Sequence, residues 1–243
     1  IVMSVPQSFH TTRWSLIVQA GASSSHEADQ ALEELCRLYW YPLYAFARRE
    51  GLSPEEAEDV TQGFFMSLLE RQDLRNVSEE KGRFRSFLRT AMKHYLLNQW
   101  RAEKTQKRGG GRSKFPIDRQ AAEQRYAVEP VESMTSEKLF DRQWALTLLD
   151  FAMQQLRLVY RKAGKEELYE TLKPTLTGTD GATSFAALGE QLGMSEGAAR
   201  TAAYRLRKDF QKQLREEVAE TLHEQDEATL EEEISRLFSA LSG

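Results

Sequence analysis

The sequence predicts an all-α protein, with two helical domains joined by a flexible linker and a helix-turn-helix in the second domain. Apolar residues recur at intervals of three and four in several long segments, as on the buried face of amphipathic helices. Three consecutive glycines at 109–111, followed by Pro116 and Pro130, indicate a break between domains. Further along, two helical patterns flank the turn residues Gly193-Met194-Ser195.

Composition excludes several classes of protein. The 243 residues carry a net charge of −4, and 40% are hydrophobic, which allows real cores. Cys36 is the one cysteine and the four histidines show no ligand spacing, so we expect no disulfide, metal site or cofactor. No apolar run reaches the ~18–20 residues that span a bilayer, and no signal peptide is evident. We therefore expect a cytoplasmic protein without membrane contact, and the absence of a nucleotide-binding glycine loop or catalytic triad argues against an enzyme.

The first domain is expected over residues 1–107. A short helix that includes Trp14 precedes a longer one over 27–50, which passes Pro42 and ends at Gly51. Ser53 and Glu56 form a capping box that starts a helix running to about residue 71. Residues 50–80 hold nine acids against two bases, and the acids of this helix gather on its outward face. That face is either solvated or an interface, and the pattern leaves both open.

Next comes a strongly basic stretch, residues 81–114, with eleven Lys or Arg against the single acid Glu103. A helix is expected to continue to about residue 107, with Phe84, Phe87 and Leu88 in a buried stripe and a basic face opposite. So many like charges repel one another unless an anion offsets them, which favours nucleic acid. Aromatic rings among the cations suit unstacked bases, at about 1–3 kcal/mol per base.

A mostly extended linker is expected over 108–135 and the second domain over 136–215. This domain begins with a helix over 136–163 and a shorter one over 166–173 that stops at Pro174. The helix-turn-helix follows, and Ser195 caps its second helix, which carries six Lys or Arg against two acids, a net charge of about +4. Exposed residues near its start are placed to reach base edges, and the basic residues after them to reach phosphates.

Residues 216–243 form an acidic C-terminal extension, with nine acids against Arg236. Thr229 and Glu232 suggest a second capping box, followed by the apolar stripe of a helix. Such a stripe has to dock on something. Two surfaces stay open: the second domain, and one of the basic DNA-binding faces of the chain.

Together, the acidic helix EEAEDVTQGFF, the basic helix RFRSFLRTAMKHYLLNQWRAEKTQKR and the later helix-turn-helix resemble a bacterial extracytoplasmic-function (ECF) sigma factor of the sigma-70 class. The resemblance implies that the acidic helix docks on core RNA polymerase. It implies that the loop and basic helix open and read the −10 promoter element, as double- and single-stranded DNA, and that the helix-turn-helix reads the −35 element. Residues 136–180 and the N-terminal TTRW segment depart from the family's two-domain pattern.

The resemblance also assigns residues to each partner. Core polymerase would contact Glu55, Glu58, Asp59, Gln62 and Phe65. The −10 element would contact Lys81, Arg83, Arg85, Arg89, Lys93, Asn98 and Arg101. The −35 element would contact Ser195, Glu196, Arg200, Thr201, Tyr204, Arg205 and Lys208.

Two other functions remain open on the sequence alone. One is a helix-turn-helix DNA-binding regulator that does not replace sigma, and the other is an interaction protein whose basic stretch binds an acidic partner. The acidic helix distinguishes a sigma factor from both alternatives, because only a sigma factor needs a surface for core polymerase. For a sigma factor, three means of control stay open: a separate anti-sigma factor, inhibition by the acidic extension within the molecule, or phosphorylation.

Overall fold

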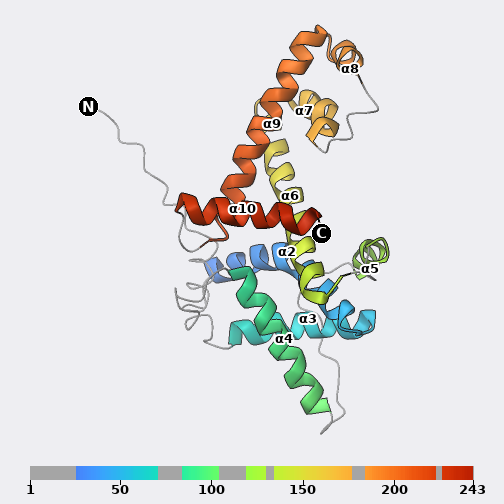
Figure 1. Cartoon of the computed structure of the whole chain (residues 1–243), viewed down its shortest axis with the longest axis vertical. Coiled ribbons are helices and arrows are strands. Elements are labelled where there is room, and N and C mark those ends of the chain that lie inside the picture. The colour runs from blue at the N-terminus through green and yellow to red at the C-terminus, as the bar shows by residue number, and fades with distance from the viewer. Residues whose placement is uncertain are drawn as a thin grey trace, which may run out of the picture. The chain divides into compact units, whose positions relative to one another are not determined.

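The computed structural model describes residues 26–70, 84–103, 119–129, 134–176, 184–222 and 226–242. These ranges hold α-helices and one short 3-10 helix, and no strand occurs in them (Figure 1). The predicted all-α class is confirmed for this part of the chain. The predicted helix around Trp14, the candidate DNA contacts Lys81 and Arg83, and the triple glycine lie outside the described residues.

The chain divides into two compact units. Unit 1 comprises residues 1–145 and 219–243, and unit 2 comprises residues 146–218. Unit 1 thus includes residues 136–145 and most of the acidic extension, which the sequence analysis assigned to later regions. The predicted functional limits, 1–107, 108–135, 136–215 and 216–243, stay a prediction.

Three helices form the core of unit 1: α2 (His26–Arg49), α3 (Pro54–Glu70) and α4 (Phe84–Glu103). Helix α3 packs against both α2 and α4. Rings join the helices edge to face, Tyr39 with Phe84 at 5.5 Å and Phe64 with Tyr95 at 5.7 Å between centroids. The side chains with almost no exposure include Leu43, Tyr44, Phe46, Phe65, Leu88, Met92 and Leu96. The predicted buried stripe of the basic helix is therefore confirmed at Phe84 and Leu88.

Part of the predicted extended linker is helical. Helix α5 spans Arg119–Ala127. Its Glu123 accepts hydrogen bonds from Arg48 Nε at 2.8 Å and from the Tyr44 hydroxyl at 2.5 Å, both on α2. The guanidinium of Arg125 lies over the ring of Tyr41, 4.0 Å from its centroid. The prediction of a mostly extended chain was wrong here, because α5 is held by partners on α2 that its own sequence does not reveal.

Unit 1 also contains the start of α6 (Ser136–Lys162) and the whole of α10 (Glu227–Ser242). Within α6, Leu139, Phe140 and Trp144 are buried. The Ser136 hydroxyl donates a hydrogen bond to the carboxylate of Glu50, at the end of α2. These contacts fix the beginning of α6 on the three-helix core.

The acidic extension is helical, as predicted, but its cap is a different residue. The carboxylate of Asp226 accepts a hydrogen bond from the amide of Thr229 at 3.0 Å. Hydrogen bonds from Thr229, from its side chain first and then from its amide, lower the pKa of Asp226. The proposed capping box of Thr229 and Glu232 is wrong, because α10 begins three residues earlier in the chain than that box requires. Leu230 and Leu237 supply its buried stripe.

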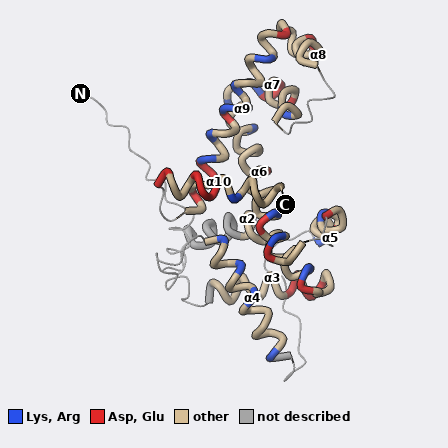
Figure 2. Tube along the Cα trace, in the orientation of Figure 1, with Lys and Arg blue, Asp and Glu red and all other residues tan. Residues whose placement is uncertain are grey.

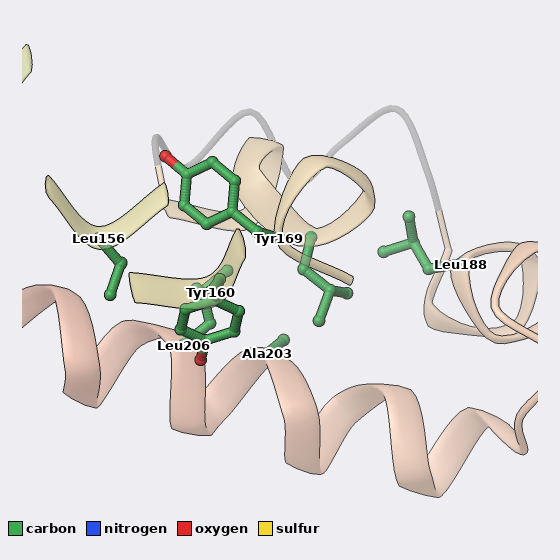
Figure 3. Packing of buried hydrophobic residues seen from close by; sticks show 7 residues of the cluster. Leu156, Tyr160, Tyr169, Leu188, Ala203 and Leu206 are labelled. Atoms are coloured by element: carbon green, nitrogen blue, oxygen red, sulfur yellow. The ribbon is translucent and has the colours of Figure 1, made fainter. Parts of the chain in front are cut away.

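Unit 2 contains the rest of α6, α7 (Glu166–Leu172), the 3-10 helix η4 (Lys173–Leu176), α8 (Phe185–Gln191) and α9 (Glu196–Ala219). One apolar cluster draws on α6, α7, α8 and α9 (Figure 3). Its buried members are Leu156, Tyr160, Tyr169, Leu172, Leu188, Ala203 and Leu206. The Tyr160 hydroxyl donates to Asp209 at 2.7 Å, and burial together with this carboxylate raises the pKa of Tyr160. The cluster holds α9 at a fixed angle to α8.

The turn between α8 and α9 depends on two glycines. Gly193 has a φ of +64°, in the left-handed region, and the Met194 amide donates to the Gly189 carbonyl at 2.9 Å. A Cβ added at Gly189 would lie 2.8 Å from the Met194 carbonyl oxygen, a backbone atom that cannot swing away. At Gly197, by contrast, an added Cβ meets nothing within 4 Å.

We therefore expect Gly189→Ala to destabilise unit 2 by about 1–3 kcal/mol, the usual cost of overpacking. The matched control, Gly197→Ala, should stabilise it by up to about 1 kcal/mol, because alanine is the better helix former. Urea unfolding of each variant, followed by circular dichroism, measures both changes. Equal stabilities for the two variants would contradict the assigned turn geometry.

Candidate nucleic-acid interface

Helix α3 carries the predicted acidic face. The capping box is confirmed: the Ser53 amide donates to the Glu56 carboxylate at 2.8 Å, and the Glu56 amide donates to the Ser53 hydroxyl at 3.3 Å. Hydrogen bonds from Ser53 to the carboxylate, chiefly the one from its amide, lower the pKa of Glu56. This cap fixes where the helix begins and hence which side chains face outward. Asp59 is exposed, and no ion pair engages it within the described residues.

Other residues assigned to this face are not free. Arg119 of α5 lies 3.2 Å from the carboxylate of Glu55 and 3.7 Å from that of Glu58. Gln62 is only 7% exposed and Phe65 is fully buried. Their predicted outward position is wrong in this structure, because α3 is packed between α2 and α4 and so has a buried sector wider than one stripe.

A cavity of about 320 Å³ lies beside Asp59. Its walls combine the carboxylates of Glu50, Glu56 and Asp59 with apolar surface that includes Leu52 and Trp100. Such a cavity suits a long basic side chain, whose apolar stem can lie on the indole while its charged head meets the carboxylates.

On α4, the basic residues Arg85, Arg89 and Lys93 form one row at intervals of four. All three are paired with acids of the same unit. Arg85 Nη1 and Arg89 Nη1 lie 2.8 and 2.6 Å from the two carboxylate oxygens of Asp141, on α6. Lys93 Nζ lies 2.8 Å from the carboxylate of Glu137, one turn earlier on α6.

Arg85 is held most tightly of the three. Its Nε donates to Glu233 of α10 at 3.0 Å, and its guanidinium lies over the ring of Trp144, 4.4 Å from the centroid. The side chains of Arg85 and Glu233 are only 7% and 1% exposed. The prediction that Arg85 faces DNA is therefore wrong for this conformation, because the side chain lies beneath α6 and α10.

The Lys93–Glu137 pair provides a pH-dependent contact. The hydrogen bond from Lys93 is the main reason that the pKa of Glu137 falls to about 2 from an ordinary 4.5. A carboxyl with a lowered pKa in the folded state stabilises the fold above its unfolded pKa, and that contribution is lost as pH falls.

We expect the difference in unfolding free energy between the wild type and Glu137→Gln to be constant above about pH 4.5. It should shrink as pH falls towards 2, where Glu137 becomes protonated in the folded state as well. Denaturant unfolding at a series of pH values measures this difference. A difference that stays constant down to pH 2 would show that Glu137 is not held by Lys93.

The C-terminal half of α4 has a different surface. Asn98 and Arg101, both predicted DNA contacts, are exposed, and Trp100 beside them is 38% exposed. Figure 2 shows Lys and Arg spaced along α4 and acidic residues gathered on α10. The predicted basic face is thus divided into a paired N-terminal half and an accessible C-terminal half.

Helix α9 presents the second predicted set. The Ser195 hydroxyl accepts a hydrogen bond from the Ala198 amide at 3.3 Å, which confirms Ser195 as the N-cap of α9. Arg200 lies 2.7 Å from Glu196 and over the ring of Phe185, which holds its guanidinium near the start of the helix. Tyr204 is 56% exposed, with the Lys208 ammonium 5.3 Å from its ring centroid. Thr201 and Arg205 are exposed as well.

Sequence reasoning missed the acidic partners of α4. Glu137 and Asp141 repeat at an interval of four, as do Arg85, Arg89 and Lys93, so each row was visible in the sequence. That the rows face each other depends on how α6 packs, for which no local signal exists. The position of the Trp144 ring under the guanidinium of Arg85 likewise has no local signal in the sequence.

The model of the ECF sigma factor family matches residues 18–216 of the chain. The chain belongs to the ECF sigma factor family. As a sigma factor it directs RNA polymerase to promoters and supports promoter-specific initiation of transcription, with core polymerase and promoter DNA as its partners. The regulator that does not replace sigma is not favoured. No curated protein and no solved structure matches the chain.

The family match ends within α9, so α10 of this sigma factor lies beyond it. In the described part of the sigma factor, no helix is both long and apolar enough to cross a membrane. Among the same residues, no group of three or more His, Cys, Asp or Glu side chains is arranged to hold a metal ion.

Proposed function

We propose that this sigma factor uses three separate surfaces in initiation. The acidic surface of α3, centred on Asp59, docks on core polymerase. The surface of α4, together with the segment that precedes it, binds and opens the −10 element, and α9 reads the −35 element. The chain makes and breaks no bond itself, needs no cofactor and acts in the cytoplasm, where polymerase is found.

For α3, the supporting observation is the cavity beside Asp59. Three carboxylates and an indole ring form its walls, so it fits an arginine or lysine side chain of polymerase. Glu55 and Glu58 lie on the same face, and their contacts with Arg119 leave Asp59 as its exposed, unpaired charge within the described residues. We assign Asp59 the central role for this reason.

Two features support DNA binding by α4. Arg85, Arg89 and Lys93 lie at intervals of four and so share one side of the helix, where their cations can follow a phosphate backbone. Arg101 is exposed nearer the end of the helix. Trp100 adds a partly exposed ring on which an extruded base can stack. Extruding a base costs a few kcal/mol, which such stacking and phosphate contacts offset.

The geometry of α9 carries the assignment of the −35 element. Its first turns present Glu196, Arg200, Thr201 and Tyr204 on an accessible surface, and Arg205 and Lys208 follow one turn later. A recognition helix places its N-terminal residues at base edges and uses adjacent cations to fix its register on phosphates. We assign the two groups to these two tasks.

Site-specific photo-crosslinking in the complex of core polymerase, sigma factor and promoter DNA tests the assignment. A photoreactive residue at Thr201 should crosslink to duplex DNA upstream, and one at Asn98 to DNA at the edge of the opened region. Asp150, exposed on α6, supplies a control position that should give no DNA crosslink. Crosslinks of Thr201 and Asn98 to the same promoter segment would overturn the division of labour.

A further inference from the structure

We propose that α10 and the first turns of α6 form an acidic cover over α4 that keeps the free sigma factor from binding DNA through this helix. The cover is defined by Glu137, Asp141 and Glu233. The inference rests on the proposed role of α4 in binding the −10 element and adds the regulation of that surface. The ion pairs between α4 and these acids must then break before α4 binds promoter DNA.

The cations of α4 are in register with the acids of α6. Along α4 the cations occur at 85, 89 and 93, and along α6 the acids occur at 141 and 137, so the two rows run in opposite directions. Each cation of the row meets a carboxylate at 2.6 to 2.8 Å. Carboxylates at this distance occupy the positions that DNA phosphates would need.

Glu233 of α10 is buried although it carries a charge. Its carboxylate is 1% exposed and meets Arg85, which is itself 7% exposed. A helix that only had to pack would gain as much or more stability from an apolar residue here, because desolvating a buried ion pair is costly. A charge in this position makes the docking of α10 specific for Arg85. Arg85 is part of the row Arg85, Arg89 and Lys93 that is proposed to bind DNA.

The junction of α10 with its neighbours is open to solvent on one side. A cavity of about 300 Å³ lies between α4, α6 and α10, lined by side chains that include Arg89, Lys138 and Arg236. The junction therefore combines ion pairs with a half-open pocket, through which solvent and ions reach these charges. Arg142 adds one hydrogen bond, donated at 2.8 Å to the carbonyl of Leu241 near the end of α10.

Helix α10 lies near the C-terminal end of this sequence, after the matched residues. The family match ends at residue 216, and α10 begins at Glu227. The helix thus lies outside the residues that the family model matches. Its acids contact the α4 surface proposed to bind DNA, which is the location that an inhibitory element requires.

The test compares DNA binding by full-length variants in the absence of polymerase. Glu233→Gln removes the charge with little change of shape, and Glu137→Gln provides a second, half-buried position in case the first variant does not fold. Glu231→Gln, exposed on the same turn of α10, is the matched control. The parent for all three variants is the full-length chain with Arg205→Ala and Lys208→Ala, which weaken DNA binding through α9. The probe is a fluorescein-labelled single-stranded oligonucleotide of mixed sequence.

We expect anisotropy titrations to show about tenfold tighter binding for Glu233→Gln, a size typical of coupling between two sites. Glu137→Gln should bind more tightly than its parent by a smaller factor, and Glu231→Gln should not differ from it. In the wild type, bound oligonucleotide should also speed hydrogen exchange at the amides of 227–242, because DNA displaces α10. Equal affinity of the parent and both cover variants, including no measurable binding by any of them, would overturn the proposal.

Transcription with core polymerase separates this inference from the proposed function. If the cover variants bind DNA like their parent but the wild-type chain still initiates at promoters, the cover fails and the proposed function stands. If photo-crosslinking finds α4 away from the opened region, the proposed function fails, whatever the oligonucleotide titrations show.

Discussion

Replacing Asp59 with arginine is expected to weaken binding to core polymerase at least about a hundredfold, because placing like charges together at an interface costs several kcal/mol. Asp59 is exposed on α3, and no ion pair within the described residues depends on it. The substitution should therefore leave the fold intact. Binding of the purified sigma factor to immobilised core polymerase, measured by surface plasmon resonance, gives the change in Kd directly.

Asp150→Arg is the control for this prediction. It makes the same change of charge at another exposed helical position, on α6 in unit 2. The control should bind polymerase with at most a small change in affinity. A folded Asp59→Arg variant with wild-type affinity would show that polymerase binds somewhere other than the acidic surface of α3.

Arg200→Ala is expected to lower affinity for the upstream promoter element about ten- to a hundredfold and to relax the base preference at one position. A bidentate contact between arginine and a base is worth about 1–3 kcal/mol of discrimination. Arg200 is suited to this role because Glu196 and the ring of Phe185 hold its guanidinium in place. Alanine is a good helix former, so α9 should remain intact.

Lys208→Ala is the comparison that distinguishes base reading from phosphate contact. It should weaken binding by a similar factor on every promoter sequence and reduce the slope of log affinity against log salt by about one phosphate contact. Transcription by the reconstituted polymerase from a promoter library, at several salt concentrations, measures both effects. A sequence preference unchanged in Arg200→Ala would exclude this residue as a base contact.

Local patterns predicted the helices and their caps well where neighbouring residues decide the structure. The capping box of Ser53 and Glu56 and the N-cap Ser195 involve residues three apart, so the sequence contains all that is needed. The turn at Gly193, where φ is positive, was likewise predicted from neighbouring residues. Periodicity likewise predicted that Phe84 and Leu88 are buried.

Tertiary partners decided the positions that sequence reasoning assigned wrongly. Helix α5 forms where a linker was expected, because Arg48 and Tyr44 on α2 hold its Glu123. Phe65 is buried because α3 has neighbours on two sides. Arg85 looked like an exposed cation, since nothing near it in sequence indicates that Glu233 would reach it across 148 positions.

Transcription in vitro from a library of promoters, with core RNA polymerase and this chain as the only sigma factor, tests the central claim most directly. The wild type should start transcripts at a defined set of promoters that share upstream and downstream elements. Asp59→Arg should start none, and Asp150→Arg should match the wild type. Transcripts that appear only after a second sigma factor is added, or that start equally with Asp59→Arg, would contradict the account.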